Sequence, residues 1–97
     1  MDIITNVRLR LDDQYTFSIS QEVDSDGSSY KDLVEVALFC GDQFVPCKYW
    51  ATNWVGADYD DDVIRMQDGM GVLDLLCYAK HYVYMETDEF IWEQEHV

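Results

Sequence analysis

The chain is poor in the residues that break or crosslink a polypeptide. It holds one proline, five glycines and three cysteines in 97 residues. So little proline and glycine excludes a low-complexity stretch or a proline-rich linker. An odd number of cysteines cannot form a complete set of disulfides, so we expect reduced thiols and an intracellular protein.

Long apolar runs are also missing. No stretch approaches the roughly 20 apolar residues that a membrane span needs. The first residues, Met1 and Asp2, are not followed by the basic and apolar regions of a signal peptide. An anionic membrane surface would repel so acidic a chain. We therefore expect a cytoplasmic protein with no membrane partner.

Basic residues are few compared with acidic ones. Six Lys and Arg face 20 Asp and Glu, which gives a formal net charge of −14. Like charges repel, and a short chain has little stability to spare, so this excess indicates a partner with a basic surface. Aromatic residues make up 14% of the chain and hydrophobic residues 48%, which excludes a disordered acidic tail. Residues 1–97 are expected to fold as one domain.

The first half of the sequence predicts β-structure. Residues 3–11 alternate in their second half and predict a half-buried strand, with Arg8 and Arg10 opposite its apolar face. Residues 12–14 predict a turn, and residues 15–20 predict a second strand with one apolar face. Together they predict a β-hairpin.

A second pair of strands is expected further along. Residues 21–29 are polar and glycine-containing, as in a loop. Residues 33–40 are apolar on both faces apart from one glutamate, which predicts a central strand covered on both sides. After a turn at residues 41–42, residues 43–50 predict a returning strand, which Pro46 restricts to an edge or a bulge.

The second half predicts one main helix. Residues 51–62 have the pattern of irregular structure, and Val63–Gln67 fits a short strand or one helical turn. Asp68 is expected to cap a helix over residues 70–83, where apolar residues recur at the helical period. Residues 87–92 fit a capped short helix or an edge strand. The predicted fold is α+β, a small antiparallel sheet of about four to five strands with one main helix packed on a face.

Acidic residues gather in three places, and no Lys or Arg follows Lys80. A folded surface with rows of carboxylates can occupy a cleft built for phosphates, which recur every ~3.4 Å along each strand of duplex DNA. The alternative is a solvated acidic face that keeps the protein soluble. The clusters are Glu22, Asp24 and Asp26; Asp58, Asp60, Asp61 and Asp62; and Glu86, Asp88, Glu89, Glu93 and Glu95.

Metal sites find little support in the sequence. Residues 58–62 offer oxygen ligands for calcium but lack the alternating acids, central glycine and distal glutamate of a calcium loop. They could equally cap a following helix. Cys40, Cys47, Cys77 and His81 could supply zinc ligands, but six residues separate the first two, where structural zinc sites use about two to four. We predict no metal and no other cofactor.

Aromatic residues flank the mid-chain acidic run. Trp and Tyr are frequent at binding hot spots beside polar rims, and equally frequent as core residues. Tyr49 is expected in the core, while both interpretations stay open for Trp50 and Trp54. Trp54 and Tyr59 are the predicted anchors of a binding surface.

Catalytic motifs are not found. The chain has two histidines, no G-x-S-x-G nucleophile motif and no phosphate-binding glycine loop. We therefore predict that the protein is not an enzyme.

In composition the chain resembles the small acidic phage-encoded inhibitors of nucleic-acid-binding defence proteins. Anti-CRISPR proteins, anti-restriction proteins and the uracil-glycosylase inhibitor belong to this class. The resemblance rests on size, aromatic content and the clusters at residues 58–62 and 86–95, not on a shared motif. It implies stoichiometric inhibition without turnover in the host cytoplasm, by DNA mimicry or by steric block. The implied partner is a basic, nucleic-acid-binding host protein such as a CRISPR effector, and nucleic acid itself is not bound.

The predicted partner-binding residues come from the two later acidic clusters and their aromatic neighbours. The alternative is a non-catalytic adaptor or regulatory module that binds protein through an aromatic patch or a sheet edge, with homodimerisation by the same edge as a variant. The predicted site consists of Trp54, Asp58, Tyr59, Asp60, Asp61, Asp62, Glu86, Asp88, Glu89, Glu93 and Glu95.

Overall fold

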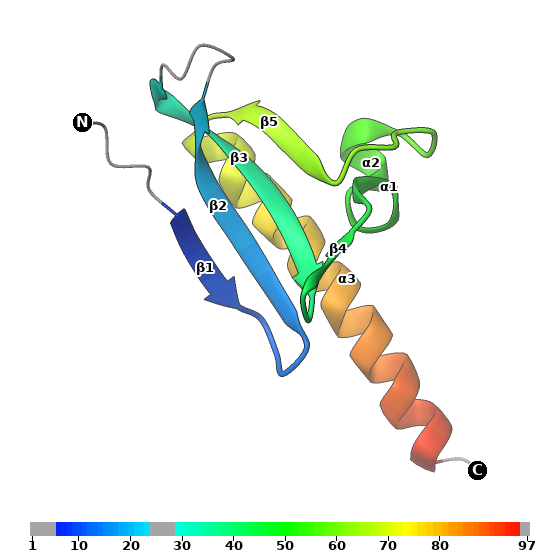
Figure 1. The fold of residues 1–97 in the computed structure, drawn as a ribbon. Coiled ribbons are helices and arrows are strands. Elements are labelled where there is room, and N and C mark those ends of the chain that lie inside the picture. The colour runs from blue at the N-terminus through cyan, green and yellow to red at the C-terminus, as the bar shows by residue number, and fades with distance from the viewer. Residues whose placement is uncertain (1–5, 24–28, 96–97) are drawn as a thin grey trace.

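The fold is an antiparallel sheet with one long helix against it (Figure 1), which confirms the predicted α+β class. The computed structural model describes residues 6–23 and 29–95, with side chains described for residues 6–21 and 32–86. The elements are β1 (Asn6–Arg10), β2 (Tyr15–Val23), β3 (Ser29–Cys40), β4 (Gln43–Val45), α1 (Cys47–Trp50), α2 (Thr52–Val55), β5 (Val63–Gln67) and α3 (Gly69–Glu95).

The sheet is built around β3. The strands follow the order β1-β2-β3-β4, and β5 pairs with β3 further along the side that β4 occupies. The predicted hairpin is confirmed: the Asp12 carboxylate accepts hydrogen bonds of 2.8 Å from the backbone N–H groups of Gln14 and Tyr15, which fixes the turn between β1 and β2. The predicted loop at residues 21–29 begins later than expected, because β2 continues to Val23; residues 24–28 lie outside the described part.

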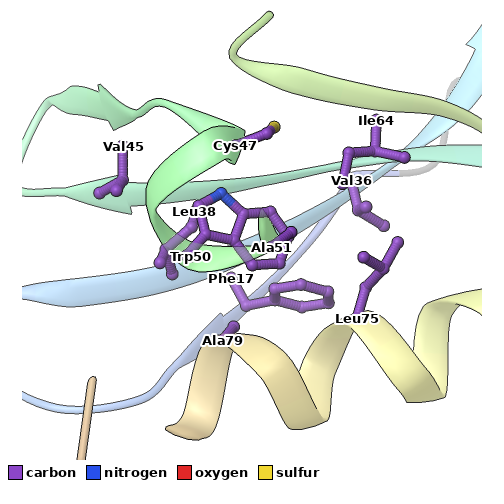
Figure 2. Close-up of a cluster of buried hydrophobic side chains, with 10 residues drawn as sticks. All are labelled: Phe17, Val36, Leu38, Val45, Cys47, Trp50, Ala51, Ile64, Leu75 and Ala79. Carbon is purple, nitrogen blue, oxygen red and sulfur yellow. The ribbon is translucent and has the colours of Figure 1, made fainter. Parts of the chain in front are cut away.

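The core lies between one face of the sheet and α3. Phe17 and Leu38 are opposite each other in β2 and β3 and are fully buried. Leu75 and Ala79 of α3 pack against them, and Trp50 meets the Phe17 ring edge-on at 6.1 Å between ring centroids. Figure 2 shows these side chains filling the space between the sheet, α1 and α3.

The other face of the sheet carries no helix in the described part of the chain, and in Figure 1 α3 lies wholly on the far side. The prediction that β3 is covered on both sides is therefore wrong. Its outward residue Ala37 is only 4% exposed, because it lies among larger side chains of the same face such as Arg8, Phe39 and Phe44. An apolar run thus indicated a central strand correctly but overestimated the number of layers.

The first strand is more exposed than its alternation predicted. All five residues of β1 are exposed, with Val7 at 40% and Leu9 at 38%. β1 is an edge strand that pairs with β2 only, and α3 contacts β2, β3 and β5 instead. A residue can face the core side of a sheet and still stay exposed when the covering helix does not reach that edge.

Pro46 ends a strand rather than interrupting one. β4 is only three residues long, and the expected strand at residues 43–50 gives way to α1 after Val45. Pro46 lacks an N–H for the ladder and has φ −56°, which suits entry into a helix. The N–H of Cys47 donates instead to the carbonyl of Asp61 at 3.1 Å.

The main helix is longer than the periodicity suggested. Asp68 caps it as predicted, because its carboxylate accepts a 2.9 Å hydrogen bond from the Gly71 N–H. The backbone then stays helical to Glu95, so both interpretations of residues 87–92, a separate short helix and an edge strand, are wrong. No proline or glycine follows Gly71 in the sequence to end the helix earlier.

The helix extends past the sheet, which makes the molecule elongated. Figure 1 shows α3 crossing behind the strands and continuing beyond them, and the principal extents are 55 × 27 × 23 Å. Among the described residues, no helix combines the length and apolar character needed to cross a bilayer.

Candidate functional site

The mid-chain aspartates lie on one short loop between α2 and β5, residues 56–62, here named the acidic loop. Gly56 opens it with φ 89°, a conformation that favours glycine. The side chains of Asp58, Asp60, Asp61 and Asp62 are all exposed. The loop leads into β5 and not into a helix, so the suggestion that these residues cap a following helix is wrong.

Backbone and side-chain contacts fix the acidic loop in place. The Asp61 carbonyl accepts the hydrogen bond from Cys47 described above, which ties the loop to the start of α1. Tyr59 is half-buried against the core, and its hydroxyl donates to the Val63 carbonyl at 3.4 Å. Burial raises the pKa of Tyr59, and the nearby Asp61 carboxylate raises it further. The loop therefore presents its carboxylates in a defined arrangement.

Little positive charge neutralises the acidic loop. Within the described residues, Asp60 is the one loop carboxylate with an ion pair, 4.0 Å from Lys48. The Asp60 side chain is 93% exposed, and a surface pair of this kind contributes ~0–1 kcal/mol. The carboxylates of Asp58 and Asp62 are left to interact with solvent or with a partner, whereas the Asp61 carboxylate also contacts the Tyr59 hydroxyl.

The loop charges also act on a buried thiol. Cys47 is fully buried beneath the loop. The pKa of Cys47 is raised to about 12, first by burial and further by the carboxylates of Asp62 and Asp61, and the Trp50 indole N–H partly offsets this rise. That indole N–H is buried and has no full hydrogen bond of its own. Cys47 is therefore a neutral core residue, not a nucleophile.

A groove lies between the two short helices and α3. Its volume is about 220 Å³, more than the ~150 Å³ of a cavity that holds benzene. Tyr49 is 61% exposed on its rim, so the expectation that Tyr49 is core is wrong, whereas Trp50 is only 3% exposed and belongs to the core. This aromatic groove is lined by Tyr49, Trp50, Thr52, Asn53, Tyr78, His81, Tyr82 and Met85.

Edge-to-face contacts between aromatic rings hold the walls of the groove. Trp54 is 37% exposed and meets the Tyr78 ring at 6.2 Å between centroids. Tyr82 meets Tyr15 at 5.9 Å in the same geometry. Burial raises the pKa of Tyr82, and the negative charge of Glu86 adds to this rise. Trp54 thus supports the groove from outside rather than lining it.

The C-terminal acidic residues are not brought to the acidic loop. Glu86 is exposed on α3, and the last turns of the helix lie at the far tip of the molecule from α2 in Figure 1. The predicted residues Asp88, Glu89, Glu93 and Glu95 belong to this helix by their backbone, and their side chains lie outside the described residues, as do those of Glu22, Asp24 and Asp26. The two later acidic clusters are therefore two separate surfaces.

The cysteines and acids of the described part form no metal centre. No group of three or more His, Cys, Asp or Glu side chains there is arranged to hold a metal ion. Cys40, Cys47 and Cys77 are all free thiols.

Sequence reasoning missed part of the aromatic groove. Tyr78, Tyr82 and Met85 follow one another at helical spacings of four and three residues, so a periodicity argument could have placed them on one face of α3. Their approach to Tyr49 depends on the position of α1, which the predicted strand at residues 43–50 concealed.

Comparisons with known proteins find no family model, no curated protein and no solved structure that matches this chain.

Proposed function

We propose that the protein is an acidic stoichiometric inhibitor that binds the basic, nucleic-acid-binding surface of a host protein through the acidic loop. The observation that carries the proposal is the set of four exposed aspartates on one anchored loop, only one of them with an ion pair among the described residues. Carboxylates fixed in this way can occupy phosphate positions without an ordering cost at binding.

Long-range electrostatics supports the same role. A net charge of −14 steers the molecule toward basic surfaces and repels other polyanions. Binding in a phosphate cleft also releases the counterions of that cleft, so affinity should fall steeply with salt. A CRISPR effector with an open nucleic-acid channel is the kind of target that this charge distribution fits.

The aromatic groove would supply the apolar part of the contact. Hot spots combine an anchored aromatic or apolar side chain with a rim of polar groups that exclude water. The α1–α2 segment joins the two features, because Lys48 reaches Asp60 of the loop while its neighbour Tyr49 lines the groove. A basic partner would thus meet carboxylates on one side of this segment and aromatic rings on the other.

The test is charge reversal in an assay of nucleic-acid cleavage by purified CRISPR effectors. The triple variant Asp58→Lys, Asp60→Lys and Asp62→Lys spares Asp61, whose backbone and carboxylate contact Cys47 and Tyr59. Wild-type protein should inhibit in stoichiometric amounts and less at high salt, and the variant should not inhibit.

The matched control carries the same change in net charge elsewhere. Asp32, Asp42 and Asp74 are exposed outside the acidic loop, so their replacement by Lys should leave inhibition within a few-fold of wild type. Equal loss in both variants would assign the effect to overall charge. Inhibition that survives the loop variant would remove the loop from the mechanism.

The aromatic groove favours a second candidate function, a protein-binding adaptor in which charge is secondary. In that case Tyr49→Ala or Met85→Ala should weaken partner binding more than the loop variant does. Both side chains are more than half exposed, at 61% and 52%, so these changes test the surface and not the core.

A further inference from the structure

All three arginines of this acidic chain lie on one side of the sheet. Side chains alternate along a strand, and Leu9, Phe17 and Leu38 point to the α3 side. Arg8 and Arg10 on β1 therefore point to the opposite side, where Arg65 of β5 lies 3.9 Å from Glu35. This uncovered surface of the sheet is named the arginine face.

Arg8 differs from the other two arginines in its partners. Arg10 forms a 2.9 Å ion pair with Asp13, and Arg65 pairs with Glu35. Arg8 forms no ion pair among the described residues, although the chain has 20 acidic residues; its guanidinium lies 5.1 Å from the centre of the Phe39 ring. Stacking on a ring leaves the N–H edge of a guanidinium free to bind an anion.

An apolar surface adjoins this guanidinium. The Phe39 and Phe44 rings lie 4.4 Å apart at 33°, and Phe44 is 45% exposed. Beside them is a hollow of about 110 Å³, whose lining includes the small residues Ser18 and Ala37, Arg8 itself, and the polar side chains of Asn6, Ser20 and Glu35. Because a cavity of ~150 Å³ holds benzene, this hollow has room for about one aliphatic side chain.

We propose that the arginine face is a second docking site, which binds a polypeptide segment carrying one carboxylate beside an apolar side chain. The carboxylate would pair with the free edge of Arg8, and the apolar side chain would enter the hollow against Phe39 and Phe44. Glu35 also lines the hollow, and its carboxylate lies 3.9 Å from Arg65 and forms no ion pair with Arg8. This partner is distinct from the basic one that the acidic loop would bind.

Charge favours a peptide over a nucleic acid as the occupant. A polyphosphate would meet a protein of net charge −14 in which Arg8 is the one arginine without an ion pair among the described residues. A single carboxylate is repelled only by nearby acidic residues, because charges farther away than about 8 Å are largely screened at physiological salt. One acid and one apolar side chain match what the face offers.

The experiment selects peptides from a random phage-displayed library on the immobilised full-length protein. Enriched peptides should carry Asp or Glu within one or two residues of an aliphatic or aromatic side chain. Arg8→Gln should weaken the best synthetic peptide by about tenfold, the size expected for a charged hydrogen-bonded pair. Asn in place of the peptide's acid should cost as much on wild type and almost nothing on the Arg8→Gln protein.

Controls separate this face from the rest of the surface. Arg10→Gln removes an equal charge from the same strand and should change affinity less than about twofold, since Arg10 is already paired. Phe44→Ser, on an exposed ring, should weaken binding independently of charge. Circular dichroism and urea midpoints confirm that each variant is folded.

Several outcomes would overturn the proposal. The first is that the enriched peptides lack an acidic residue. The second is that they bind the Arg8→Gln protein as well as wild type, or are enriched equally on both proteins. The third is that Tyr49→Ala, and not Arg8→Gln, weakens their binding. Binding of an oligo-dT single strand that is lost in Arg8→Gln would reassign the face to nucleic acid. None of these results depends on the acidic loop, so the loop proposal stands or falls by its own test.

Discussion

The acidic loop and the arginine face carry opposite charges, and they differ in how many of these charged side chains contact a partner within the protein. On the loop, four aspartates stand exposed with one weak ion pair among the described residues. On the arginine face, two of three arginines are paired with acids and the third is stacked on Phe39. The abundant negative side chains are thus mostly exposed and unpaired within the described residues, whereas each of the few arginines makes a defined contact.

The two regions depend on the same core, and the largest expected effect removes both. Phe17→Ala should cost about 3–5 kcal/mol, because a large side chain at 0% exposure leaves a cavity under the sheet. Urea unfolding measures the loss. Leu9→Ala is the matched control, since Leu9 is opposite Phe17 but 38% exposed and should cost much less. Equal costs would show that the core does not lie where the structure places it.

Alkaline pH should first reduce stability through the ionisation of Cys47, which lies beneath the acidic loop. The pKa of Cys47 rises from 9.0 to about 12 on folding, so the folded state holds this proton more tightly than the unfolded state. Its contribution is complete below pH 9 and is lost as pH rises toward 12, at roughly 1.4 kcal/mol per pH unit. Urea midpoints at pH 8, 9, 10 and 11 test this.

A variant assigns that alkaline loss. Cys47→Ala will lower stability at every pH by leaving a cavity, but its stability should fall less between pH 9 and 10. Above pH 10, Tyr15 and Tyr82 add a loss of the same sign, because burial raises the pKa of both. Arg8→Gln should leave the slope unchanged. Stability that is flat up to pH 11 would contradict the burial of these groups.

A smaller effect is expected on the arginine face. Arg8→Gln should reduce stability by about 0.5–1 kcal/mol through loss of its contact with Phe39 at an exposed site. Phe39→Leu should cost more, because the ring also packs on Phe44, and should abolish any further effect of Arg8→Gln. Additive costs in this double-mutant cycle would show that the stacking contributes nothing.

The smallest effect on stability is expected for the aspartates of the acidic loop. Asp58→Asn, Asp60→Asn and Asp62→Asn together should shift stability by no more than about 0.5 kcal/mol, because all three side chains are exposed. Their removal should also reduce the stabilisation that added salt gives the wild-type protein by screening repulsion. Thermal unfolding at low and high salt measures both. A strong loss would assign the aspartates a structural role.

Local patterns predicted the elements that depend on local periodicity. The hairpin at the start of the chain and the main helix follow from alternation and from the 3.6-residue period, and Asp68 acts as the predicted cap. The prediction for the stretch after Pro46 was wrong, because the Cys47 N–H donates to the carbonyl of Asp61, fourteen residues away, and not to a neighbouring strand. Sequence alone holds no sign of that pairing.

Burial was predictable only where an element's surroundings were predictable. Tyr49 and Trp50 are adjacent and chemically similar, yet one is 61% exposed and the other 3%. Their difference follows from the orientation of the four-residue helix α1, which turns one ring toward the core and the other toward solvent. The exposure of the mid-chain aspartates needed no such information, since carboxylates are rarely buried.

The burial of Cys47 makes its rate of labelling by a thiol reagent a measure of how often the core opens. A thiol reagent should modify Cys40 and Cys77 rapidly, because both are exposed, while Cys47 reacts only when the sheet and α1 separate. The slow third labelling event then reports the opening of the core beneath the acidic loop without any added probe. A partner that binds the acidic loop and holds it against α1 would slow the labelling of Cys47. Binding could therefore be detected on the wild-type protein from this labelling rate.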